Sequence, residues 1–293
     1  MIAPPFVLRE LVERALAEDL GHGDITTRSI FPKAFKGSAV LMAKEDLVPA
    51  GIEIASRVFE ALDPALKFWQ LAADGEPVEV GSVIAQLEGD GRCILMGERV
   101  AINFLQRLSA IATLTSKYVA CVKGFKARIV DTRKTTPGWR GIEKYAVRVG
   151  GGFNHRFSLG DGILIKDNHV DLAGSLSRAV EKARHSSPHP FKIEVEARTL
   201  EEVKEAITSG ADIILLDNMH PGLMRKAVEM IKGRALIEAS GGVTLSNVAE
   251  IAATGVDYIA VGALTHSAPA VDICLNIEKT AEKATKKITR KNP

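Results

Sequence analysis

The sequence is poor in cysteine. It has three, Cys93, Cys121 and Cys274, which are far apart and form no CxxC pair. An odd number of separated cysteines argues against a disulfide framework or a zinc site and is typical of free thiols in a reducing compartment. The start lacks a charged and then apolar leader, and no apolar run approaches the ~20 residues that cross a bilayer. We therefore expect a cytoplasmic protein with no membrane as partner.

An excess of charge of either sign is absent too. Lys and Arg number 38 and Asp and Glu 36, so the formal net charge is +2. A nucleic-acid binder normally presents a basic surface, so this balance argues against nucleic acid as a partner. Hydrophobic residues make up 46% and charged residues 25% of the 293 residues, which is the composition of a folded globular protein. This length suits one large barrel or two ordinary domains.

The first third of the chain mixes helical and strand patterns. Apolar residues at helical spacing predict a helix that ends at Leu20-Gly21 and another from about 52 to 62. Short β-like runs at 39–42, 67–71 and 82–87 are separated by turn residues. A long helix is expected from about 94 towards 122, with Arg99 and Asn103 on its polar side. We predict a small α+β domain over residues 1–108.

The rest of the chain repeats a strand–helix unit. Short apolar strands are expected at 128–131, 163–166, 193–196, 213–217, 236–239 and 258–262, and helices at 172–184, 200–208, 222–232 and 245–253. Such alternation is typical of a parallel sheet covered by helices. A doubly wound sheet usually carries a glycine-rich loop after its first strand, and none is present, so we favour a closed or nearly closed barrel over 109–267. Residues 268–293 should hold a Lys-rich amphipathic helix, from 276 to 290, that packs back on the first domain.

Charged residues and glycines stand at the carboxyl ends of the expected strands. Parallel strands of a barrel end on one rim, where barrel enzymes carry out their chemistry, so these residues should meet there. In chain order they are Asp131-Thr132-Arg133-Lys134, Lys166-Asp167-Asn168-His169, Glu194 and Glu196, Asp217-Asn218, Glu238-Ala239-Ser240-Gly241-Gly242, and Gly262.

Four side chains supply permanent positive charge: Arg133, Lys134, Arg156 and Lys166. Arginine grips a carboxylate with its planar fork, and lysine acts on phosphate as a point charge. Each residue alone is explained more simply by a surface salt bridge. Together on one rim they would repel one another without an anionic ligand, so we infer an anionic, phosphate-bearing substrate.

Two carboxylates and two glycine turns complete the expected site. Glu196 and Asp217 end successive strands, and their hard oxygen donors suit Mg²⁺. Each carboxylate could instead pair with the Arg and Lys group, and the two interpretations are compatible because a metal–pyrophosphate unit would lie between them. The turns Ser240-Gly241-Gly242 and Val261-Gly262-Ala263 follow the last two strands, where backbone N–H groups can cradle phosphate. A plain tight turn explains the first of them equally well. His155 and His169 lack a His or Cys partner at metal-ligand spacing, so we expect them to hydrogen bond a carboxylate or phosphate.

Several strings of residues occur together in a way that is specific to one family. They are Asp131-Thr132-Arg133-Lys134-Thr135-Thr136-Pro137-Gly138, Gly150-Gly151-Gly152-Phe153-Asn154-His155-Arg156, Leu164-Ile165-Lys166-Asp167-Asn168-His169, Glu194-Val195-Glu196, Leu216-Asp217-Asn218 and Glu238-Ala239-Ser240-Gly241-Gly242. Over essentially its whole length the chain resembles quinolinate phosphoribosyltransferase. The resemblance implies an N-terminal α/β sandwich and an open (β/α) barrel of the type II phosphoribosyltransferase kind. It also implies a homodimer, or a hexamer, in which Arg99 reaches the partner's site.

The resemblance further implies a Mg²⁺-assisted transfer of phosphoribosyl from 5-phosphoribosyl 1-diphosphate to quinolinate, with decarboxylation. The products would be nicotinate mononucleotide, pyrophosphate and CO₂, as in de novo NAD biosynthesis. The implied catalytic residues are Arg133, Lys134, Lys166, Glu196 and Asp217, and the implied substrate-binding residues are Arg99, Thr132, His155, Arg156 and His169. Glu196 and Asp217 would bind the metal, and the turns 240–242 and 261–263 the 5-phosphate.

Three other interpretations stay open at this point. A related phosphoribosyltransferase acting on another pyridine or pyrimidine carboxylate would need the same cations. A non-catalytic sensor of a phosphate ligand would use the same glycine turns. A barrel aldolase would use Lys166 as its Schiff-base lysine.

Overall fold

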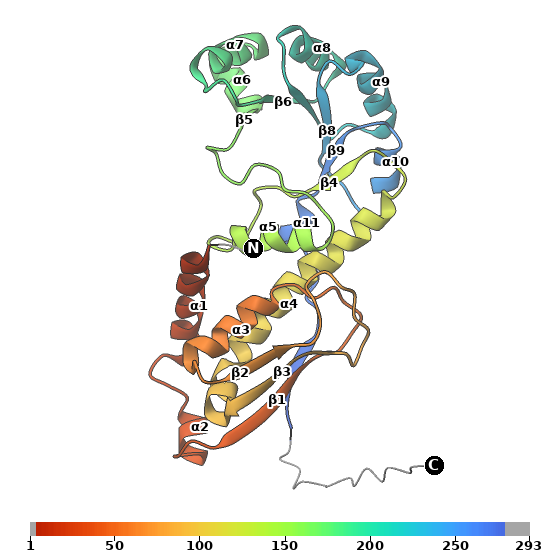
Figure 1. Ribbon diagram of the computed structural model, residues 1–293. Coiled ribbons are helices and arrows are strands. Elements are labelled where there is room, and N and C mark those ends of the chain that lie inside the picture. The colour runs from red at the N-terminus through yellow and green to blue at the C-terminus, as the bar shows by residue number, and fades with distance from the viewer. Residues whose placement is uncertain (1–3, 279–293) are drawn as a thin grey trace, which may run out of the picture. The chain divides into compact units, whose positions relative to one another are not determined.

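The computed structural model describes residues 4–278, which form two compact units (Figure 1). The N-terminal unit comprises residues 4–107 and 271–278, and the barrel unit comprises residues 108–270. The division falls between Arg107 and Leu108, one residue before the boundary expected from the sequence, and it lies within a single helix, α4 (Gly91–Cys121). Within residues 4–278, no helix combines the length and the apolar character that crossing a bilayer requires.

The N-terminal unit is built on a four-stranded antiparallel sheet in the order β10-β1-β3-β2. Alternate residues of β1 are fully buried, so one face of the sheet lies on the core, where Phe59 of α3 is fully buried as well. This is the expected α/β sandwich. Besides the first part of α4, its elements are α1 (Pro5–Leu20), α2 (Ile25–Ile30), β1 (Lys36–Ala43), α3 (Ile52–Leu62), β2 (Lys67–Gln70), β3 (Val83–Asp90) and β10 (Ile273–Ile277).

The last described residues correct one prediction. The sequence predicts an amphipathic helix from 276 to 290, but Asn276 and Ile277 belong to β10, which pairs antiparallel with β1. Burial alternates in β10, with Ile273 and Leu275 buried, and a period of two over five residues is too short a signal to separate from a neighbouring helical pattern. The rest of the predicted helix lies outside the described residues.

The barrel unit contains the six strands that the sequence predicts, each within two residues of its expected ends. The strands are β4 (Arg128–Val130), β5 (Ile163–Ile165), β6 (Ile193–Ala197), β7 (Ile213–Asp217), β8 (Leu236–Ser240) and β9 (Tyr258–Ala260). Between and after them lie α5 (Arg140–Val149), α6 (Asp167–Ala173), α7 (Leu176–Ser186), α8 (Leu200–Thr208), α9 (Pro221–Ile231), α10 (Val248–Ala252) and α11 (Ala263–His266).

The strand order identifies the barrel as an open one. All strands are parallel and pair in the order β4-β9-β8-β7-β6-β5, so five consecutive strands are neighbours and the first strand lies beside the last. A doubly wound sheet would reverse its strand order in the middle, and this one does not. In the described residues β4 and β5 are opposite edges and do not pair, so the barrel is open, as the family resemblance implies. Figure 1 shows α7, α8 and α9 following one another along one side of the strands.

One predicted helix is two helices. The sequence predicts a single helix over 172–184, whereas α6 ends at Ala173 with Gly174 as its C-cap, and α7 begins after Ser175. Gly174 has φ 92°, a left-handed conformation that ends a helix readily, and the Ser175 side chain accepts a hydrogen bond from the Arg178 N–H as the cap of the next one. The short helix α6 matters to the site because its N-cap, Lys166, directly follows β5.

Gly150 offers a test of packing inside the barrel unit. A Cβ atom at this position would lie 2.4 Å from the carbonyl oxygen of Ala112 and 2.7 Å from Cβ of Thr115, both on α4. We expect Gly150→Ala to lower the free energy of unfolding by about 2 kcal/mol or more, because backbone has to move. Gly141→Ala is the matched control, since nothing lies closer than 3.9 Å to its Cβ and alanine favours helix α5. Urea unfolding of both variants measures the difference, and equal stabilities would contradict the packing account.

Candidate active site

Ionisable side chains join the carboxyl ends of three neighbouring strands. Lys166, directly after β5, places Nζ 3.2 Å from Oε2 of Glu196 in β6. Arg198, directly after β6, places Nη2 3.1 Å from Oε1 of Glu196 and Nε 3.3 Å from Oδ2 of Asp217 at the end of β7. The same Nη2 lies 2.8 Å from Oδ2 of Asp167. The structure therefore brings together Lys166, Glu196 and Asp217, three of the predicted site residues.

Arg198 is the member of this network that the sequence analysis missed. It comes two residues after Glu196, so in the strand periodicity of two it continues the same face. That spacing was the available signal, but Arg198 follows the strand and belongs to none of the expected strand ends. Hydrogen bonding to Asp167 and Asp217 raises the pKa of its guanidinium, so it is a permanent cation amid three carboxylates.

Arg133 and Arg156 form a second cationic group. Burial first, and then the charge of Arg133, lowers the pKa of the Arg156 guanidinium, so the two charges act on each other. Arg156 donates from Nη1 to the carbonyl oxygen of Gly162 at 2.8 Å. Nε of Arg133 is buried and finds no hydrogen-bond partner among the described residues. Two neighbouring guanidiniums repel each other, and the Nε–H of Arg133 lacks an acceptor. An anionic ligand would neutralise the charge and supply the acceptor.

Lys134 lies against the last glycine turn. A Cβ at Gly262 would lie 3.1 Å from Cδ of Lys134, so the lysine stem runs close to the backbone there. The carbonyl oxygen of Lys134 accepts a hydrogen bond from the Thr265 hydroxyl at 2.7 Å, and its N–H donates to Oγ1 of Thr132 at 3.0 Å. Thr132 therefore shapes the turn that carries Lys134 towards the turn at Gly262.

The two glycine turns differ from the prediction in detail. The helix after Ser240-Gly241-Gly242 was expected at about Thr244, but α10 begins at Val248, so the turn is not at a helix N-terminus. It is held instead by Asn247, whose Nδ2 donates to the Gly242 carbonyl at 2.9 Å. In the second turn the N–H of Val261 donates to Val130 at 2.9 Å, so that group is not available to an anion. Gly262 is the N-cap of α11, a helix of four residues that the sequence analysis does not predict and that starts at Ala263.

Gly241 is required by a close approach at this rim. It has φ 91°, and a Cβ there would lie 2.2 Å from Oδ1 of Asn218, itself in a left-handed conformation with φ 54°. Nδ2 of Asn218 donates to Oδ2 of Asp217 at 3.0 Å. The glycine turn after β8 is thus fitted to the amide that supports Asp217.

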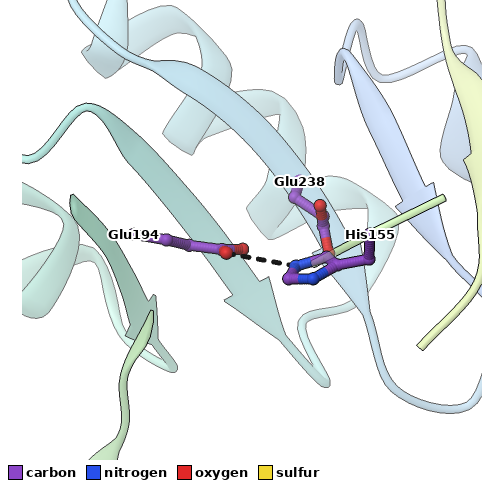
Figure 2. Close-up of side chains that lie close together, drawn as sticks. All are labelled: His155, Glu194 and Glu238. Atoms are coloured by element: carbon purple, nitrogen blue, oxygen red, sulfur yellow. Dashed lines mark hydrogen bonds and ion pairs between the residues drawn. The ribbon is translucent and has the colours of Figure 1, made fainter. Parts of the chain in front are cut away.

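The two predicted histidines have different surroundings. His169 is exposed, and its Nδ1 accepts a hydrogen bond from the Lys166 N–H at 2.9 Å, which caps α6. His155 lies inside the barrel, where its imidazole stands between Glu194 and Glu238 (Figure 2). His155, Glu194 and Glu238 are here called the inner cluster. A substrate-binding role for either ring stays a prediction.

A buried ion pair holds the segment that carries His155. Nζ of Lys144 contacts Oδ1 of Asp131, with side-chain exposures of 3% and 0%. Asp131 also accepts from Nδ2 of Asn154 at 2.6 Å and from the N–H of His155 at 2.9 Å, and Lys144 donates to the His155 carbonyl at 3.0 Å. Asp131, expected at the rim, is thus an internal support rather than a rim group.

Glu196 and Asp217 fit a hard divalent cation in kind. Both offer carboxylate oxygens that face the same guanidinium, so negative charge is concentrated between them. Mg²⁺ keeps several waters and needs only one or two protein carboxylates beside substrate phosphates. Within the described residues a cluster of three possible metal-ligand side chains is found at His155, Glu194 and Glu238, which is a different place.

The open parallel barrel and its rim define the class of protein. The carboxyl ends of the barrel strands carry cations, carboxylates and glycine turns. This combination is typical of an enzyme that acts on an anionic, phosphate-bearing substrate.

Comparison with known proteins identifies the family. The family models for the quinolinate phosphoribosyl transferase N-terminal and C-terminal domains match residues 24–109 and 111–276. The chain is 44% identical over 278 residues to a probable nicotinate-nucleotide pyrophosphorylase [carboxylating] of Synechocystis sp., covering 94% of each chain. A protein of the same name from Bacillus subtilis is 44% identical over 94% of this chain and 95% of its own. The crystal structure of NadC from Streptococcus pyogenes superposes with a TM-score of 0.90 at 39% identity, covering 94% of this chain and 99% of that one. The chain belongs to the quinolinate phosphoribosyltransferase family.

Arg99 lies in the other unit. It is exposed on the part of α4 that belongs to the N-terminal unit, on the side that the sequence predicts to be polar.

Proposed function

We propose that the protein transfers the phosphoribosyl group of 5-phosphoribosyl 1-diphosphate to quinolinate and decarboxylates the product. The observation that carries this proposal is the cationic pair of Arg133 and Arg156, in which Nε of Arg133 is buried without a partner among the described residues. A ring dicarboxylate supplies acceptors for such guanidiniums and removes their repulsion. Lys166, at the end of β5, adds a third cation, and family membership supports the same substrate pair.

The other rim residues would act on the sugar and its phosphates. The carboxylates of Glu196 and Asp217 would stabilise the positive charge that develops on the ribose as pyrophosphate leaves. Lys134 would neutralise pyrophosphate, with Thr132 shaping its turn, and the turns 240–242 and 262–263 would hold the 5-phosphate. The pyridine nitrogen then attacks C1 of the ribose from a fixed position, which lowers the entropic barrier.

Mg²⁺ is part of this proposal, with Glu196 and Asp217 as its protein ligands. When bound, it neutralises the pyrophosphate leaving group. Loading the site would loosen the contacts of Arg198 with these two carboxylates, leaving Asp167 as that guanidinium's partner.

Decarboxylation follows from the chemistry of the intermediate. The carbon beside the quaternised ring nitrogen loses CO₂, and the electron pair left on it is stabilised by the adjacent positive charge. A proton then replaces CO₂ on that carbon. This step requires no pyridoxal or thiamine cofactor.

We further propose a homodimer in which Arg99 reaches the partner's site. Arg99 is exposed on its helix, as a residue that serves a second subunit must be. Sedimentation of the full chain distinguishes monomer, dimer and hexamer. A cytoplasmic location stays a prediction.

The direct test measures pyrophosphate and CO₂ together. Purified protein with quinolinate and 5-phosphoribosyl 1-diphosphate should release both in equal amounts, and only with Mg²⁺ present. Pyrophosphate without CO₂ would point to another pyridine or pyrimidine carboxylate as acceptor, and release of neither product would overturn the proposal.

A further inference from the structure

The inner cluster lies one layer below the rim. Glu194 and Glu196 are two residues apart in β6, so both face the inside of the barrel. Nε2 of His155 lies 3.1 Å from Oε2 of Glu194 and 3.6 Å from Oε1 of Glu238 in β8. Figure 2 shows the three side chains together, with a dashed line between His155 and Glu194. Both glutamates are only 5% exposed. Two carboxylates and an imidazole thus share a small, largely dehydrated space.

His155 cannot satisfy both carboxylates. Its Nδ1 accepts a hydrogen bond from the N–H of Arg156 at 2.8 Å, so the proton of the neutral ring is on Nε2. That single N–H points at Glu194, the nearer of the two. Oε1 of Glu194 and Oε1 of Glu238 are both buried without a hydrogen-bond partner among the described residues. A buried oxygen without a donor is costly, so this cluster needs at least one more hydrogen.

A proton on Glu238 supplies it. The groups that act on Glu238 are Glu194 from β6, His155 from the segment before β5, and Asp131 from the end of β4. Burial, and then the charge of Glu194, raise the pKa of Glu238 to about 8. Lys192 and Tyr258 line the same cavity of about 460 Å³ as the inner cluster, but within the described residues neither forms a hydrogen bond with this carboxyl.

A metal ion is the competing way to neutralise two carboxylates. A neutral imidazole that binds a metal through Nε2 must carry its proton on Nδ1. In His155 that position is occupied by the N–H of Arg156 as a donor, so Nδ1 has no room for a proton. The hydrogen-bonding pattern favours the protonated carboxyl.

We propose that Glu238 is held as an uncharged carboxylic acid and that, with the carboxylate of Glu194, it fixes His155 and thereby Arg156, making both glutamates positioning residues. Both ring nitrogens of His155 have partners, so its effect on substrate passes through Arg156. Arg156 is held at its backbone N–H by the ring and at Nη1 by the Gly162 carbonyl. Rotation of an unsupported imidazole would release the first of these. What Arg156 binds rests on the proposed function, whereas the charge state of Glu238 does not.

Infrared difference spectroscopy of the full chain tests the charge state without substrate. At pH 6.5, wild type minus Glu238→Gln should show the carbonyl band of one protonated carboxylic acid, and the band should fade as the pH is raised through about 8. Absence of the band would overturn the proposal, as would a band lost in Glu194→Gln but kept in Glu238→Gln. The proposal would also be overturned if the purified wild type contained one equivalent of zinc or another metal that Glu238→Gln lacks, because an ion rather than a proton would then neutralise the carboxylates.

Kinetics tests the positioning role. Glu238→Ala should raise KM for quinolinate about tenfold while changing kcat and KM for 5-phosphoribosyl 1-diphosphate less than about threefold. Glu238→Gln, which keeps an uncharged donor of the same shape, should rescue most of that loss if the folded alanine variant shows it. In wild type KM for quinolinate should rise above pH 8, as Glu238 ionises beside Glu194, and in Glu238→Gln this rise should vanish. Equal pH profiles would overturn the role, and a protein that shows the band but no turnover would fail the proposed function alone.

Discussion

Replacing Lys144 with methionine is expected to lower the free energy of unfolding of the barrel unit by about 3–5 kcal/mol, because Asp131 would be left as a buried carboxylate without its cation. Both side chains are almost wholly buried, with exposures of 3% and 0%. Burial raises the pKa of Asp131 and lowers the pKa of Lys144, and their mutual attraction opposes both shifts. Removing the lysine removes only the opposing effect, so the cost of burying the charge appears in full.

The loss should depend on pH with a definite sign. Without Lys144 the pKa of Asp131 rises further, so the folded variant holds a proton that the unfolded chain releases above about pH 4. Stability then falls as the pH rises, by up to about 1.4 kcal/mol per unit, until Asp131 ionises in the folded state. Urea unfolding at pH 5 and pH 8, followed by circular dichroism, measures both the loss and its slope.

Lys126→Met is the matched control. Lys126 pairs with Asp257 at 2.9 Å in the same unit, but its side chain is 57% exposed, so its removal should cost less than about 1 kcal/mol at either pH. Equal losses in the two variants, or a loss in Lys144→Met that shrinks with rising pH, would contradict the buried-pair account. Asp131→Asn combined with Lys144→Met should recover part of the stability, because no charge is left to bury.

The sequence predicts the strand that precedes Asp131 but not the pairing of Asp131 with Lys144. Asp131 was recognised as part of a strand-end string, but its neighbours Thr132 and Arg133 are partly exposed while Asp131 is not. Lys144 lies in α5, where a lysine normally faces solvent, and its burial depends on Asp131 and on the His155 carbonyl, which are 13 and 11 residues away in the sequence. Strand positions follow from local apolar periodicity, and so were predictable. The partner of a charge depends on how strands are ordered in space, and no local pattern carries it.

At the rim, too, some contacts could be predicted from the sequence and others could not. Parallel strands must end together, so the meeting of Lys166, Glu196 and Asp217 could be predicted from strand ends alone. Which cation lies between the carboxylates could not, because Arg198 reaches back from the loop after β6. Likewise β10 pairs with β1 across more than two hundred residues, a contact that periodicity cannot reveal.

Replacing Glu196 with alanine is expected to cut turnover by about a hundredfold while leaving the fold intact, because a carboxylate near the reacting sugar would be lost from a preorganised site. The side chain is 8% exposed and pairs with Lys166 and Arg198, which are themselves half exposed, so the cost in stability should stay near 1 kcal/mol. Steady-state release of pyrophosphate, with unfolding measured on the same sample, separates the two effects.

The nature of the substitution then identifies what Glu196 contributes. Glu196→Gln keeps the shape but not the charge, so it should be nearly as slow as the alanine variant if charge on the ribose or on bound Mg²⁺ is what matters. Glu201→Ala removes an exposed carboxylate from the first turn of α8, outside the rim network, and should leave turnover within about twofold. A glutamine variant close to wild type would mean that Glu196 only spaces Lys166 and Arg198. Wild-type turnover in a folded Glu196→Ala would remove the residue from the mechanism and leave Asp217, held by Asn218, as the carboxylate that faces the sugar.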